Sequence, residues 1–210
     1  MLSPTSKHIR HLKQCVTITG LGLDDFQSQL DMIPDIVALF TRAVNEDRIE
    51  PHSIIGELKE LSTLHASNRY FTPKKAAPNA KKLTFHRDVD PFGNLARLLG
   101  PAHVHIEENV VSYYECVGNT KYVNIKPASI SVGDLVELQV SFIMVPLREN
   151  KFKATMVLHS ILVLERMFTQ VRKSSNCHLN DTESATTFRK QWPCVLRGRF
   201  PKIWERKLGP

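Results

Sequence analysis

The chain has 210 residues, 42% of them hydrophobic, and a formal net charge of +7 at pH 7. Because this length and apolar content suffice for a buried core, we expect one soluble globular domain, or one domain with an appendage. Pro146, Arg148 and Lys151 interrupt the longest apolar run. A transmembrane helix needs roughly 18 to 20 apolar residues in a row, so the sequence excludes one.

The cysteines and the first residues indicate the compartment. Cys15, Cys116, Cys177 and Cys194 are far apart and form no CxxC pair, and residues 1–23 contain no apolar core of a secretory signal. A disulfide framework is therefore not expected, and the sequence indicates a reducing, intracellular compartment, either nucleus or cytoplasm. Residues 1–23 also lack acids and contain three basic residues, so an organelle transit peptide is the alternative.

The positive charge is unevenly distributed along the chain. Residues 1–87 contain 12 Lys/Arg and 9 Asp/Glu, residues 88–165 contain 6 and 9, and residues 166–210 contain 10 and 3. The last segment alone therefore has a net charge of +7, equal to that of the whole chain. This distribution predicts a slightly acidic core that carries a basic arm for an anionic partner.

Two helices are predicted near the N-terminus. Apolar residues recur at alternating spacings of three and four from 23 to 44, which predicts one buried helix face that Asp24 could cap and that Pro34 should kink or divide. A second helix is expected after Pro51. Residues 1–66 are thus predicted to be a helical part packed on the core, or a dimerising seam. The two apolar faces are Leu23, Phe26, Leu30, Ile33, Val37, Phe40 and Val44, and then Ile54, Ile55, Leu58, Leu61 and Leu64.

Residues 67–90 have the composition of an exposed basic linker. Residues 67–82 contain two prolines, two lysine pairs and almost no apolar periodicity. We therefore place the boundary between the helical part and the β-rich part here. The paired lysines are expected to be solvated linker charges, with a nuclear-import signal as the alternative.

A β-rich core is predicted over residues 91–168. A short helix over 91–99 ends at Gly100, and a period of two begins at His103. Gly118-Asn119 suits a hairpin turn, and strands are expected at 135–147 and 151–165. Both are apolar on alternate faces at their centres, which is typical of strands covered on both sides. The predicted fold class is α+β, with N-terminal helices packed on a small antiparallel sheet in meander order or an OB-like or SH3-like barrel.

Residues 169–210 are predicted to be a polar loop followed by a basic aromatic tail. Flat aromatic rings alternate with cations in the tail, a pattern that suits nucleic acid because cations neutralise phosphates while rings stack on exposed bases. The alternative is that the tryptophans dock on the core and the arginines are only solvated. The candidate nucleic-acid-binding residues are Arg189, Lys190, Trp192, Arg197, Arg199, Lys202 and Trp204.

Two metal sites are weaker hypotheses. His105, Glu107 and His159 match the two-histidine, one-carboxylate ligand set of non-haem iron enzymes, and His105 and Glu107 would share one face of a strand. Cys177, His178 and Cys194 could supply three zinc ligands, although no CxxC knuckle is present. We expect no cofactor and assign no catalytic residue.

Residues 103–165 resemble a group of uncharacterised proteins from expanded families in fungal genomes. The resemblance rests on five stretches of sequence, and it implies no known activity. Because mobile elements are a common cause of such expansion, it favours a role near DNA. The stretches are EENVVSYY at 107–114, KPA at 126–128, VGDLVE at 132–137, QVSF at 139–142 and VPL at 145–147.

We therefore predict a non-enzymatic nucleic-acid-binding protein, with single strands as the expected target and a link to mobile elements. One alternative is a protein-interaction module that recruits a partner through its helical stripe or a sheet edge. A second alternative is a metal-dependent enzyme of the non-haem iron type.

Overall fold

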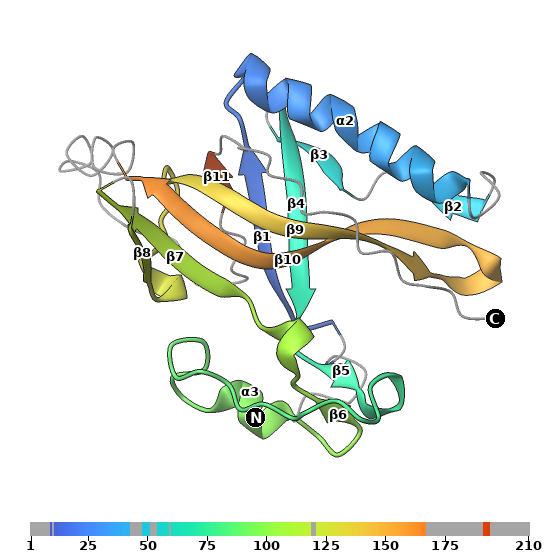
Figure 1. The fold of residues 1–210 in the computed structure, drawn as a ribbon. Helices are drawn as coiled ribbons and strands as arrows, with labels where there is room; N and C mark the ends of the chain where they lie inside the picture. The colour runs from blue at the N-terminus through green and yellow to red at the C-terminus, as the bar shows by residue number, and fades with distance from the viewer. Residues whose placement is uncertain are drawn as a thin grey trace, which may run out of the picture.

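The computed structural model describes residues 9, 11–42, 48–50, 54–58, 60–118, 121–166 and 191–193. Within this part the fold is mixed α+β, with one long helix, one short helix and a nine-stranded sheet (Figure 1). The elements are β1 (Lys13–Thr19), α2 (Asp24–Thr41), β2 (Ile49–Glu50), β3 (Ile55–Leu58), β4 (Leu61–Arg69), β5 (Thr72–Pro73), η2 (Lys74–Ala76), α3 (Asn94–Leu98), β6 (His103–Val104), η3 (Glu107–Asn109), β7 (Ser112–Val117), β8 (Lys121–Asn124), η4 (Pro127–Ser129), β9 (Leu135–Pro146), η5 (Arg148–Asn150), β10 (Phe152–Glu165) and β11 (Gln191–Pro193).

Strand β10 organises the main sheet. One edge pairs antiparallel with β9 along its whole length, and the other edge is shared by β2, β4 and β7, all parallel to it. The strand path is β11-β1-β4-β10-β7-β8, and its pairings do not close a barrel within the described residues. The two predicted hairpins, β7–β8 and β9–β10, are confirmed. The expected meander order is wrong. A meander would pair β8 with the next strand, β9, whereas β7 pairs with β10.

A β-bulge in β10 keeps its apolar residues on the core side. Ala154, Met156 and Leu158 are buried before the register shift between Leu158 and Ser160, and Ile161 and Val163 are buried after it. The bulge changes the phase of alternation by one residue, so both halves of a long strand face the same core.

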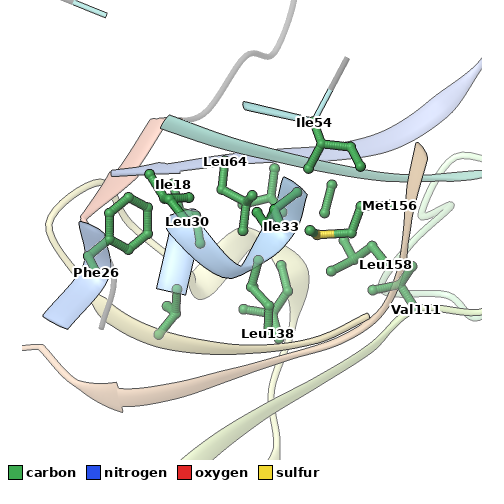
Figure 2. Packing of buried hydrophobic residues seen from close by; sticks show 14 of the residues in the cluster. Ile18, Phe26, Leu30, Ile33, Ile54, Leu64, Val111, Leu138, Met156 and Leu158 are labelled. Atoms are coloured by element: carbon green, nitrogen blue, oxygen red, sulfur yellow. The ribbon is translucent and has the colours of Figure 1, made fainter. Parts of the chain in front are cut away.

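Helix α2 packs between strand β4 on one side and strand β9 on the other. In Figure 2, Leu30 and Ile33 lie between Leu64 of β4 and Leu138 of β9. Phe26 packs beside the start of the helix, where a side chain on Gly20 would overlap its ring. Phe26, Leu30 and Ile33 of the helical stripe therefore belong to the protein's own core, as expected for a helix packed on the sheet, whereas Leu23 is exposed.

Helix α2 differs in detail from its prediction. It runs through Pro34 as one element, so it is not divided there. Leu23 rather than Asp24 occupies the N-cap position, while Asp24 and Asp25 lie in the first turn, where carboxylates stabilise the positive end of the helix dipole.

The predicted second helix is wrong. Its residues form the antiparallel hairpin β3–β4, which turns at Glu60 with a positive φ of 67°. The apolar spacing of Ile54, Leu58 and Leu61 fits a helix, but β4 instead alternates Leu64, Ala66 and Asn68 into the core. Because Asn68 is polar, this period of two is hard to see in the sequence.

Strands on both sides of residues 67–90 share one sheet and one core. Val16, Ile18 and Leu64 pack in the same buried cluster as Leu138 and Leu158. Strand β9 is covered on one face only, since Ile143 is exposed, so the expected covering of both faces is also wrong. No helix in the part of the chain that the structure describes is long and apolar enough to cross a bilayer.

Candidate nucleic-acid interface

A small lobe, residues 70–106, projects from the main sheet. It contains β5, η2, α3 and β6, which lie together at the bottom of Figure 1. The two-stranded sheet β5–β6 connects its two ends, and a hydrogen bond from Leu83 N to His105 O (2.8 Å) ties its middle to the C-terminal end. The segment predicted as a linker is therefore held in place by backbone pairing over part of its length.

An aromatic cluster forms the interior of the small lobe. The Phe85 ring stacks on the His105 ring with centroids 4.1 Å apart, and it meets Tyr70 and Phe71 nearly edge-on at 6.3 Å and 5.7 Å. Phe71 is fully buried. Stacked and edge-to-face contacts fix ring orientations, so this cluster holds the imidazole of His105 in one position.

His105 has an accessible ring nitrogen even though its side chain is almost completely buried. Its Nδ1 lies 2.9 Å from the Tyr70 carbonyl oxygen, which can only accept, so Nδ1 donates and Nε2 of the neutral ring is left as an acceptor. Burial lowers the pKa of His105 and so favours this neutral form. The described residues give Nε2 no partner, and none of their fully enclosed polar side-chain atoms lacks one. Nε2 is therefore accessible, and His105 is one of the residues that line the cleft beside it.

That cleft has a volume of about 480 Å³. One wall is formed by residues 84–86, 88 and 89 of the small lobe, and the opposite wall by residues 124–127 at the end of β8. Gln14, His105 and Tyr113 line it between these walls. The volume lies in the range typical of small-ligand sites.

Hydrogen bonds hold the floor of the cleft rigid. The Tyr113 hydroxyl donates to Gln14 Oε1 (3.0 Å), and Gln14 Nε2 donates to the Asn109 carbonyl (3.1 Å). Asn109 in turn donates from Nδ2 to Thr72 Oγ1 (3.0 Å) and accepts at Oδ1 from Ile106 N (3.1 Å). Burial raises the pKa of Tyr113, so its hydroxyl keeps its proton and remains a donor. The polar floor is therefore fixed before any ligand arrives.

The mouth of the cleft is charged. Lys126 Nζ lies 3.8 Å from Asp88 Oδ1, and His86 Nδ1 lies 3.4 Å from Asp88 Oδ2. The Lys126 and His86 side chains are 72% and 75% exposed, so these contacts are solvated and weak.

A basic run without acids passes through the small lobe. Between Glu60 and Asp88 the sequence has six Lys/Arg and no Asp/Glu. All six side chains are exposed, and within the described residues none forms an ion pair. Lys13, also exposed, extends the run because it lies opposite Arg69 in the β1–β4 register. The run comprises Arg69, Lys74, Lys75, Lys81, Lys82 and Arg87.

The residues of the iron hypothesis are not brought together as a metal site. His105 lies in the small lobe, Glu107 is exposed in η3, and His159 lies at the β10 bulge with Nε2 2.8 Å from Ser141 Oγ. The described part of the chain contains no group of three or more His, Cys, Asp or Glu side chains that could hold a metal ion. The zinc candidates Cys177, His178 and Cys194 lie outside the described residues.

Most of the predicted tail site also lies outside the described residues. Only Gln191–Pro193 is described, as β11, which pairs parallel with β1 and places Trp192 opposite Ile18. Arg189, Lys190, Arg197, Arg199, Lys202 and Trp204 are not described.

Sequence reasoning missed the cleft. Its floor comes from positions 14, 105, 109 and 113, whose types and spacing form no motif. The acid-free basic run, in contrast, can be found by counting charges along the chain.

Comparison of the chain with protein-family models, with curated proteins and with solved structures gives no match.

Proposed function

We propose that the protein binds single-stranded nucleic acid through the basic run of the small lobe, assisted by the basic C-terminal tail. The observation that carries this proposal is the set of six exposed cations between Glu60 and Asp88 with no acid among them. A solvated surface normally mixes both signs of charge, whereas a phosphate backbone requires one sign along a continuous path.

An exposed ring on the same lobe supports the preference for single strands. Phe92 is 80% exposed, which is unusual for a phenylalanine, and it lies between the basic run and α3. A flat ring in water beside cations can stack on an unpaired base, while the bases of a duplex are already stacked on each other. The tail adds the same combination of rings and cations, at Trp192 and Trp204 among others.

The test is fluorescence anisotropy with a labelled single strand and with a duplex of the same sequence, over a series of salt concentrations. If the six cations of the run each contact a phosphate, the plot of log K against log salt has a slope of about −4 for the single strand. Binding that does not depend on salt contradicts the proposal.

A charge-reversed pair separates the basic run from general electrostatics. Lys81→Glu/Lys82→Glu is expected to weaken binding at least about tenfold and to reduce the salt slope by about 1.5. Arg148→Glu/Lys151→Glu makes the same change of charge at two exposed residues of the β9–β10 turn. Equal losses in the two variants would show that only net charge matters.

The tail is tested by separate substitutions, because β11 pairs with β1 and removal of the whole tail would expose a strand edge. Arg197→Gln/Arg199→Gln is expected to weaken single-strand binding by a further factor of about three to ten. Unchanged affinity would restrict the interface to the small lobe.

A further inference from the structure

We infer that the cleft beside His105 receives one unstacked base of the bound strand. This inference rests on the proposed function, and it names the part of the nucleic acid that the basic run cannot read. Cations along a backbone are indifferent to sequence, so a contact with a base requires a separate polar site.

The position of the cleft fits this role. Its wall begins at Thr84, two residues after Lys82 of the basic run. Arg87 belongs to the same stretch of sequence, between the lining residues His86 and Asp88, but does not itself line the cleft. Lys126 lies on the opposite wall. A backbone held by Lys82 and Lys126 would pass close to the cleft, and a base turned toward the protein at that point would enter it.

The floor of the cleft fits the edge of a base. His105 is only 5% exposed, yet its Nε2 is an acceptor with no partner in the described residues. The amide of Gln14 is also fixed at the floor, and it uses only one of its two N–H groups, toward Asn109. An acceptor beside a donor matches the edges of nucleobases, which present N–H groups next to ring nitrogens or carbonyl oxygens.

The clamp on His105 favours a binding role. The Phe85 stack and the Tyr70 carbonyl hold the ring in one orientation at the lining of a space large enough for a base.

The experiment compares two single strands of equal length and charge, one with bases and one made of abasic sites. We expect the full-length protein to bind the strand with bases about tenfold more tightly, a gain typical of one well-buried hydrogen-bonded group. A 2-aminopurine placed in the strand should change its fluorescence when it leaves the stack.

Two variants and a matched control locate the contact. Asn124 is exposed at the cleft wall, so Asn124→Trp should block the mouth without disturbing the core, and His105→Phe should keep the ring stack but remove the acceptor. Both are expected to lower the preference for the strand with bases to the part that stacking on Phe92 and the tail rings contributes, while the salt dependence of binding stays the same. Asn79→Trp makes the same change at an exposed residue of the small lobe that does not line the cleft, and it should discriminate as the unmodified protein does.

The outcomes separate this inference from the proposed function. If the unmodified protein binds both strands equally and with a steep salt slope, the base site is wrong and the backbone interface stands. The same holds if Asn124→Trp prefers the strand with bases over the abasic strand as strongly as the unmodified protein does. If neither strand binds in a salt-dependent way, the proposed function itself is wrong, and the base site falls with it.

Discussion

At the scale of single residues, Arg166 joins three segments that are far apart in the sequence. Its guanidinium donates to both carboxylate oxygens of Glu115 on β7 (2.6 and 3.0 Å), to Asp134 Oδ2 (3.3 Å) and to the Ser129 carbonyl (2.7 Å). Asp134 is fully buried before β9, whereas Arg166 follows β10. The planar fork of arginine suits this arrangement, because it satisfies two carboxylates and a carbonyl at once.

Arg166→Ala is expected to lower the free energy of unfolding by about 2 to 4 kcal/mol, because it removes the guanidinium that contacts the buried Asp134 and forms two hydrogen bonds with Glu115. Arg166→Lys should lose about half as much, since lysine keeps the charge but not the bidentate geometry. Urea denaturation followed by circular dichroism measures both. The control is Arg148→Ala, which removes an exposed arginine without an ion pair in the described residues. A loss in Arg166→Ala no larger than in Arg148→Ala would contradict the importance of this contact.

The same contact makes stability depend on pH. The hydrogen bond from Arg166 holds the pKa of Glu115 below its ordinary value of 4.5. A carboxylate whose pKa is lowered by folding contributes its full stabilisation above the ordinary pKa and loses it as the pH falls through the lower, folded value.

Burial also lowers the pKa values of His105 and His159 from 6.5, so the unfolded chain binds protons first and stability begins to fall below about pH 6.5. Glu115→Gln should therefore weaken the pH dependence of the free energy of unfolding below about pH 4.5. The loss of stability between about pH 6.5 and 5, which comes from the histidines, should stay unchanged. Urea titrations at a series of pH values measure the free energy of unfolding. The prediction is contradicted if this free energy falls below about pH 4.5 as steeply in Glu115→Gln as in the unmodified protein.

At the scale of elements, Pro34 is a weak point of α2. It is exposed in the interior of the helix, and its ring removes the backbone donor that would bond to the Leu30 carbonyl. Pro34→Ala should raise the free energy of unfolding by about 1 to 3 kcal/mol, less than the full propensity difference because the unfolded chain also gains freedom. Asp35→Ala, at the next exposed position, should change it by at most about 0.5 kcal/mol. Destabilisation by Pro34→Ala would mean that the proline ring makes contacts the helix needs.

Elements with a strong apolar period or a turn signal could be predicted from the sequence, and the others could not. The stripe through Phe26, Leu30 and Ile33 and the long hairpin β9–β10 have such signals. The β3–β4 hairpin turns at Glu60, a residue type that does not suggest a positive φ, and the buried Asn68 breaks the apolar alternation of β4. Asn68 is buried because its amide donates to the carbonyls of Glu108 and Leu158, contacts that only the folded chain creates.

The candidate site divides in the same way. The basic run is a local property, so a count of charges finds it. The cleft depends on Gln14 meeting Tyr113 and on Phe85 stacking on His105, which are pairings over 99 and 20 positions of sequence. No spacing rule connects such positions, because they become neighbours only when β1, β7 and the small lobe assemble.

At the scale of the whole molecule, the predicted boundary at residues 67–90 does not separate two cores. Leu30 of α2 and Leu158 of β10 are both 1% exposed and belong to the same buried cluster, although they lie on opposite sides of that boundary. Helix α2 would lose the apolar contacts on one of its sides without β9, and the core face of β9 would lose part of its cover without α2.

We therefore expect the described fold to unfold as one cooperative unit. Leu30→Ala and Leu158→Ala should each lower the free energy of unfolding by about 2 to 5 kcal/mol, the range for truncating a buried leucine. Hydrogen exchange resolved by segment should show the core amides of β4 and of β9–β10 losing the same amount of protection in both variants, because they open together. If Leu30→Ala weakened protection only before residue 67, the N-terminal part would be a separate folding unit. The shared core makes that outcome physically difficult, since removing Leu30 opens a cavity lined from both sides of the boundary at once.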